Sequence, residues 1–201
     1  MLTEGQWSAW LTPVRVTLSR LRLTAVLRGL AGRAAHPAGG TAPAWSGMEM
    51  FKENQLTVDD PRLLVTANGL ARNLERILSI AARHDIKTVL CTMAVNLTDC
   101  APFGSTNRTD LTAEQRQAWQ SLYREGRLAA QNGRTDDARA AFARAAELDD
   151  HHAELVYRLA HLDRQRGEAA SAARLFARAR DLDTQRFRTD ARLNNIIRQV
   201  A

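Results

Sequence analysis

The sequence predicts a mainly α-helical fold in which repeated helical hairpins are attached to a partial segment of α/β type. Three observations support this prediction. The C-terminal part repeats itself at a fixed interval, and apolar residues in much of the chain recur at helical spacing. One short, nearly unbroken apolar run instead has the pattern of a buried parallel strand. We expect an N-terminal basic amphipathic helix, a linker, the partial α/β segment, two hairpins and a capping helix, at residues 1–31, 32–47, 48–118, 119–184 and 185–201.

The N-terminal arm carries most of the positive charge. The chain has a net charge of +6, and no Asp or Glu occurs between Gly5 and Trp45. The arginines in that stretch are Arg15, Arg20, Arg22, Arg28 and Arg33. Apolar residues there fall on one helical face, which predicts a helix that either contacts an anionic membrane surface or packs on a domain. Because the basic residues are not spread over a folded surface, we expect no nucleic-acid partner.

The first helix of the folded region has a clear start. Asp60 precedes Pro61, so a capping side chain is followed by proline at the first helical position, and we expect a helix over residues 61–84. Residues 87–97 (KTVLCTMAVNL) then read as a buried strand. A helix, a tight turn and a buried strand make one unit of a parallel α/β sheet, and such a unit needs further strands from elsewhere.

The loop at residues 96–107 follows the carboxyl end of the predicted strand, where ligands bind in open α/β sheets. Asn96 and Asp99 offer polar groups, and Pro102 and Phe103 offer apolar contact. These four residues are the candidate ligand site. The alternative is a loop that caps the strand and leads into the next helix.

The internal repeat is the strongest pattern. Residues 141–149 read AFARAAELD and residues 175–183 read LFARARDLD, at an offset of 34. The residues Gly133, Ala138, Phe142, Ala145 and Asp149 recur at that offset as Gly167, Ala172, Phe176, Ala179 and Asp183. An interval of 34 residues is that of the tetratricopeptide repeat (TPR), a pair of antiparallel helices. The sequence therefore predicts two such hairpins and a protein or peptide partner bound in their groove.

The residue types suit paired helices. Alanine lets helices approach closely, phenylalanine fills the space between hairpins, and glycine permits a positive φ in the turn. The expected packing residues are Leu122, Gly126, Ala138, Phe142, Ala145, Leu159, Ala160, Ala172, Phe176 and Ala179. Asp163 stands where the first hairpin has Ala129, so we expect the second hairpin to be less regular.

Two repeats leave apolar end faces open, since about three are usually needed for stability. We expect residues 187–200 to cap one end, and Trp119 with a helix at residues 111–117 to cap the other. His151 and His152 lie between the predicted hairpins, and we interpret both as solvent-exposed turn residues.

No pattern indicates a metal, a cofactor or export. Cys91 and Cys100 form no CxxC pair and have no His at zinc-finger spacing. No apolar stretch reaches the roughly 18–20 residues of a spanning helix, and the first ten residues lack the order of a signal peptide. We expect a cytoplasmic chain as written, which leaves a membrane-associated parent protein open.

Several blocks resemble a bacterial family of SGNH (GDSL-like) hydrolase-type esterases with inserted TPR repeats. They are residues 45–51 (WSGMEMF), 59–63 (DDPRL), 73–74 (NL) and 94–103 (AVNLTDCAPF), followed by the repeats and by residues 181–183, 186–188 and 196–198. The resemblance covers roughly residues 45–201. It implies a flavodoxin-like sheet, a nucleophilic Ser in a GDS-type block, an oxyanion-hole Gly and Asn, and a DxxH-type Asp/His pair.

None of those catalytic blocks occurs in this sequence, and Ser105 has no credible partner as a nucleophile. We therefore expect no catalytic residue and an inactive chain: an internal, non-catalytic TPR interaction segment of an SGNH hydrolase-like protein. The alternative is part of a carboxylic-ester hydrolase, acting on an acyl ester of a sugar or lipid, whose Ser, Asn and His blocks lie outside this chain.

Overall fold

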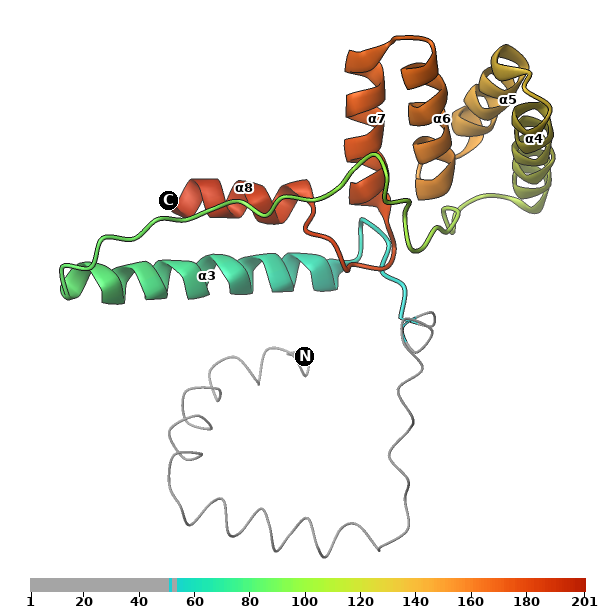
Figure 1. The fold of residues 1–201 in the computed structure, drawn as a ribbon. Helices are drawn as coiled ribbons and strands as arrows, with labels where there is room; N and C mark the ends of the chain where they lie inside the picture. Colours follow the sequence, from blue (N-terminus) through green and yellow to red (C-terminus); the bar gives the residue numbers. More distant parts are fainter. Residues whose placement is uncertain (1–50, 52–53) are drawn as a thin grey trace, which may run out of the picture. The chain divides into compact units, whose positions relative to one another are not determined.

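The computed structural model describes Phe51 and residues 54–201, which fall within one compact unit (Figure 1). Over those residues the chain is mainly helical, with no strand. The helices are α3 Pro61–Arg83, α4 Ala113–Gln131, α5 Thr135–Leu148, α6 Ala153–Gln165, α7 Ala169–Leu182 and α8 Ala191–Val200. The predicted N-terminal helix, the linker and the arginine arm lie outside the described residues. None of the helices described is both long enough and apolar enough to cross a bilayer.

Helices α4–α7 form the two predicted hairpins, with α4 packed on α5 and α6 on α7 (Figure 1). The turns within the hairpins contain Gly133 and Gly167, with φ of +72° and +79°. This left-handed conformation favours glycine, because an L side chain is strained there. A capping box opens α4: the Thr112 hydroxyl accepts from the Gln115 N–H, and the Gln115 side chain accepts from the Thr112 N–H.

Phe142 lies at the centre of the hairpin core. Its side chain is 1% exposed and packs with Leu155 and Leu162 of α6, so it joins the first hairpin to the second. Gly126 of α4 faces it so closely that an added Cβ would lie 2.5 Å from Phe142 Cδ1. The other expected packing residues lie in or against the buried clusters of α4–α7: Leu122, Ala138, Ala145, Leu159, Ala160, Ala172, Phe176 and Ala179.

Asp163 stands where the first hairpin has the small residue Ala129, yet it is buried, with 1% of its surface exposed. It accepts hydrogen bonds from Arg139 Nε of α5 at 2.7 Å and from Ser171 Oγ of α7 at 2.6 Å. Burial alone would raise the pKa of Asp163, but these two hydrogen bonds outweigh it and lower the pKa. The carboxylate therefore ties three helices together at the position where the repeat pattern is irregular.

The predicted strand at residues 87–97 does not form. This segment runs back alongside α3 and α8 without regular structure (Figure 1), and Val89 is 85% exposed. A strand needs a neighbour to pair its backbone groups, and the described residues supply none. Side chains take that place at two points: Asn194 of α8 accepts from the Met93 N–H at 2.8 Å and donates to the Met93 carbonyl at 3.0 Å, and Arg188 donates to the Asn96 carbonyl at 3.3 Å. The predicted α/β segment is therefore one helix and an irregular return.

Both predicted end caps differ from the structure. α8 packs against α3 instead of capping the hairpins (Figure 1). Leu97 packs against Phe176 and its neighbours instead, and the Tyr157 hydroxyl donates to the Thr98 carbonyl at 2.5 Å. At the other end, the predicted helix at residues 111–117 is not a separate cap, because α4 runs unbroken from Ala113 to Gln131 and contains Trp119. The chain leaves the hairpins after α7. The helix that follows them in the sequence, α8, is therefore not the segment that covers their end.

His152 also differs from its prediction as an exposed turn residue. It is buried, and its Nδ1 accepts from the Leu155 N–H at 3.3 Å, which caps α6. Its ring lies 4.6 Å from that of Trp119 and 5.6 Å from that of Tyr123, centroid to centroid. His151 is only partly exposed and lies near Asp59 and Asp150. The turn between the hairpins is therefore part of the core.

Candidate functional site

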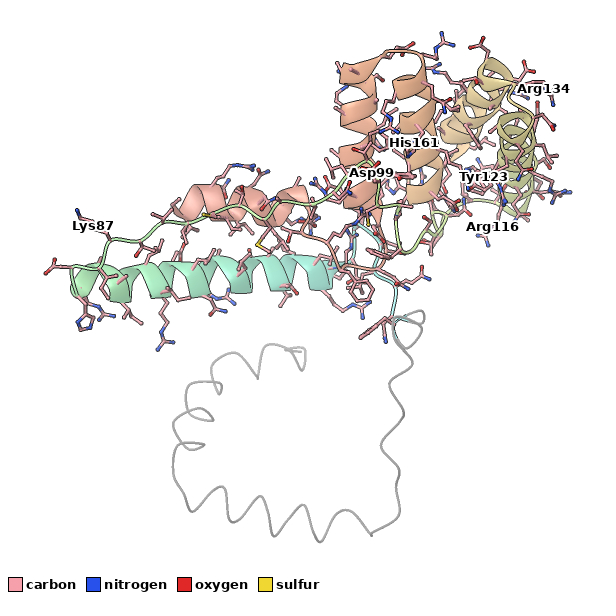
Figure 2. All side chains as sticks on the ribbon, viewed as in Figure 1. Lys87, Asp99, Arg116, Tyr123, Arg134 and His161 are labelled. Atoms are coloured by element: carbon pink, nitrogen blue, oxygen red, sulfur yellow. The ribbon has the colours of Figure 1, made fainter. Side chains whose placement is uncertain are left out.

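A groove of about 260 Å³ lies between the first helices of the two hairpins. Its lining includes Ala130 of α4, Tyr157, Arg158 and His161 of α6, and Ala101 of the preceding loop. These side chains share a face because α4 and α6 occupy equivalent places in successive hairpins. Figure 2 labels Tyr123 of α4 and His161 of α6 on this part of the molecule.

A hydrogen-bond network joins the two helices beside the groove. Arg158 Nε donates to the Tyr123 hydroxyl of α4 at 3.2 Å and to Glu154 Oε1 at 3.0 Å, and Arg158 Nη2 donates to the same oxygen at 2.5 Å. Burial lowers the pKa of His161, and the nearby Arg164 guanidinium lowers it further. His161 is therefore neutral at physiological pH, and the charge of Glu154 is balanced by that of Arg158.

The exposed side of α4 adds a hollow of about 390 Å³ lined by Trp119, Tyr123, Arg124, Arg127 and Leu128, among others. Leu128 is 51% exposed, whereas Trp119 is 3% exposed. Among the described residues neither arginine has an ion-pair partner, and the Trp119 Nε1 donor is buried without an acceptor. The partly buried ring of Tyr123, the exposed Leu128 and two free cations are thus brought together on one helix, whereas Trp119 and its N–H donor are buried. Such a surface can hold carboxylates and carbonyl groups of a bound chain.

The four residues of the predicted ligand loop do not lie at a sheet edge. The Asn96 side chain accepts from the N–H groups of Thr98 and Asp99 at 3.1 and 2.9 Å, which closes a local turn. Phe103 lies edge-on to the Phe187 ring, with centroids 5.7 Å apart, and Pro102 beside it is partly buried. The loop lies against α6, where the Tyr157 hydroxyl donates to the Thr98 carbonyl at 2.5 Å. Figure 2 labels Asp99, the next residue, and His161 of α6.

The two aspartates of the repeat hold this loop in place. Asp183 accepts from the N–H groups of Phe103 and Gly104, both at 3.0 Å. Asp149, its equivalent in the first hairpin, accepts from the Asn107 side chain at 2.8 Å and from the backbone N–H of Arg108 at 3.1 Å. Their recurrence at the repeat interval was visible in the sequence, but the partners lie 41–80 residues away along the chain.

The described residues present no assembled catalytic or metal centre. Ser105 Oγ accepts from the Glu154 N–H at 2.9 Å, so it caps the start of α6, and no histidine is bonded to it there. Within the same part of the chain, no group of three His, Cys, Asp or Glu side chains lies together as a metal ion would require.

Of the two families that the sequence suggested, the comparisons with known proteins support only the tetratricopeptide repeat. The tetratricopeptide repeat family model matches residues 129–195. No curated protein and no solved structure matches the chain. The esterase resemblance receives no support from these comparisons, and the helical hairpins are consistent with the tetratricopeptide match, which runs from the end of α4 into α8.

Proposed function

We propose that this chain is an interaction scaffold that binds a partner polypeptide across the groove between α4 and α6 and the hollow on the exposed side of α4. The Tyr123 hydroxyl of the hollow accepts from Arg158 of the groove, which links the two surfaces. Tetratricopeptide repeats generally mediate protein–protein interactions, and the groove lies between the first helices of the two repeats. The observation that carries the proposal is that Tyr123 and the exposed Leu128 lie with the unpaired cations of Arg124 and Arg127 on α4. The partner is a segment that carries carboxylates beside apolar side chains.

The charges around the groove favour an acidic partner. Glu154 is neutralised by Arg158, with which it forms an ion pair at 2.5 Å. Arg124 and Arg127 retain an uncompensated charge among the residues that the structure describes. Desolvated arginine–carboxylate contacts are stronger than neutral hydrogen bonds, whereas exposed ones are screened by salt. Binding should therefore weaken as the salt concentration rises.

A charge reversal tests this proposal. The probe is a fluorescein-labelled peptide of alternating Glu and Leu, titrated with the full chain and followed by fluorescence anisotropy. Arg124→Glu combined with Arg127→Glu should weaken binding about tenfold or more, because two attractive contacts become repulsive. Arg144→Glu is the matched control, since Arg144 is an exposed arginine of α5 that lines neither the hollow nor the groove. Equal affinity of the groove variant and the control, or equal binding of a Gln–Leu peptide, would contradict the proposal.

The ester-hydrolase alternative has one supporting observation. α3 and the segment after it leave apolar side chains exposed, which is expected if the β-sheet that would cover them in an α/β domain is absent. On that alternative the chain is part of an SGNH-type carboxylic-ester hydrolase that acts on an acyl ester of a sugar or lipid. The isolated chain should then show no turnover of p-nitrophenyl acetate. Translation of the flanking DNA should reveal a GDS block upstream and a DxxH block downstream, and their absence removes this alternative.

The arginine arm supports a separate proposal of weak membrane-surface contact by Arg15, Arg20, Arg22, Arg28 and Arg33. Vesicles containing phosphatidylglycerol should bind the full chain at low salt and release it as salt screens the arginines. Binding that does not respond to salt would remove this contact.

A further inference from the structure

The segment at residues 86–95 is apolar and exposed. Ile86, Val89 and Met93 are 60%, 85% and 58% exposed, and the segment contains one charged residue, Lys87, at its start beside the end of α3 (Figure 2). α3 next to it buries Ala67 alone and leaves Ile77 57% exposed. Large apolar side chains exposed close together in a folded protein point to a contact site.

The backbone of this segment has unused hydrogen-bonding groups. Among the described residues, the N–H groups from Lys87 to Val95 make no hydrogen bond except that of Met93, which Asn194 binds. Successive residues of an extended chain direct their N–H and C=O groups to opposite edges. Because Met93 faces α8, the edge that points away from α8 belongs to Thr88, Leu90, Thr92 and Ala94.

We propose that residues 88–95 form a docking strand, which pairs along this free edge with a β-strand of a partner polypeptide. The pairing supplies what the isolated segment lacks: acceptors and donors for its main chain, and cover for its apolar side chains. β-Branched residues such as Val89, Thr92 and Val95 suit a strand. This surface is separate from the α4–α6 groove, so the inference does not depend on the proposed function.

The charge around the segment selects the partner. α3 with the turn to Lys87 and α8, counted with their N-cap residues, carry seven cationic side chains and four carboxylates. The cations are Arg62, Arg72, Arg76, Arg83, Lys87, Arg192 and Arg198, and the carboxylates are Asp60, which pairs with Arg62, Glu75, Asp85 and Asp190. A second copy of this chain would bring the same cations to the contact, which is unfavourable. The partner strand is therefore a different sequence, apolar in its centre and acidic at its ends.

A bilayer is the other surface that attracts apolar and basic residues. It does not explain this segment, because hydrocarbon offers no partner to unpaired backbone groups. A paired strand satisfies the backbone and the side chains together. A partner strand would therefore protect the amide groups of the free edge from hydrogen exchange by bonding to them, whereas a bilayer offers them no such bond.

Amide hydrogen exchange of the full chain tests the docking strand. The probe is a synthetic peptide of alternating Val and Thr with Glu at both ends. Its addition should slow exchange about tenfold or more at Leu90, Thr92 and Ala94, and less at Cys91. Thr92→Pro should abolish the effect because it removes a donor from the free edge. Cys91→Pro, the matched control, should leave the effect because it removes a donor from the edge that faces α8.

Two further arms exclude the other occupants. The same peptide with N-methylated backbone amides keeps the side chains but removes donors, so it should give no protection. Equal protection by the methylated peptide, no protection by the unmodified one, or stronger protection by phosphatidylglycerol vesicles would overturn the proposal. Protection that rises with protein concentration without any probe would identify a second copy and would also overturn it.

Discussion

The hairpins and the α3–α8 region use similar apolar residues in opposite ways. In α5 the side chains of Ala138 and Phe142 are 0% and 1% exposed, whereas in α3 those of Leu64 and Ile77 are 59% and 57% exposed. α3 is the longest described helix, with 23 residues, and it buries Ala67 alone. Repeated helices bury their apolar faces against one another, but a single helix and its irregular return cannot. Among the described residues, the first region therefore buries its apolar side chains, and the second leaves many of its own exposed.

Removal of a large side chain from each region should show this contrast most strongly. Phe142→Ala should destabilise the hairpins by about 3–5 kcal/mol, because it opens a cavity among fully buried neighbours. Ile77→Ala should change the free energy of unfolding by less than about 0.5 kcal/mol, since its side chain is exposed. Urea unfolding of the full chain, followed by circular dichroism, measures both. Similar losses for the two variants would show that α3 already has a buried face.

Adding one methyl group should change stability with opposite signs in the two regions. Gly126→Ala should destabilise by about 1–3 kcal/mol, because the new Cβ would meet Phe142. Gly69→Ala should stabilise α3 by about 0.5–1 kcal/mol, since no atom lies within 4 Å of that position and alanine favours a helix. Thermal unfolding of both variants gives the signs. A stable Gly126→Ala variant would contradict the close approach of α4 and α5.

The contact between the loop and the hairpins can be broken at one carboxylate. Asp183→Asn should cost about 1–3 kcal/mol, because it leaves buried donors, including the N–H groups of Phe103 or Gly104, without full partners. Hydrogen exchange at those two amides should rise. Asp137→Asn is the control: its carboxylate is 64% exposed in an ion pair, so its removal should change little. Unchanged exchange in Asp183→Asn would show that the loop is held by other contacts.

The smallest expected effect is a pH dependence of the hairpins. Burial lowers the pKa of His152, an effect that the nearby Glu154 and Asp149 oppose. The unfolded chain then binds a proton below about pH 6.5, where the folded chain does not. The stabilising contribution of a neutral His152 is therefore complete above that pH and is lost as the pH falls below it, toward the lowered pKa of the folded state.

His152→Asn keeps a side chain that can cap α6 but removes the titrating ring. The difference in unfolding free energy between pH 7.5 and pH 5.5 should be smaller in this variant than in the unaltered chain. Equal pH dependence of the two proteins would show that the folded and unfolded states protonate His152 alike.

The local parts of the fold were predictable from residues close together in sequence. The period of 34 residues predicted the mainly helical hairpins, which the structure and the family match confirm. Gly133 and Gly167 lie in the left-handed turns expected of them, and Asp60 caps α3 through the Arg62 N–H. These features depend on backbone geometry over a few residues, so the pattern alone contains the information.

The tertiary structure decided the features that depend on contacts between residues far apart in the sequence. Residues 87–97 have the composition of a strand, but a strand forms only where another segment pairs with it, and Asn194, 101 residues from Met93, is one contact made instead. Other contacts also join distant segments. His152 is buried against Trp119, and Asp149 and Asp183 accept hydrogen bonds from the loop that precedes the hairpins. The sequence by itself determined the repeat and its helices, because those arise from local periodicity. Which surfaces are covered, and by what, depends on contacts between remote residues that periodicity does not encode.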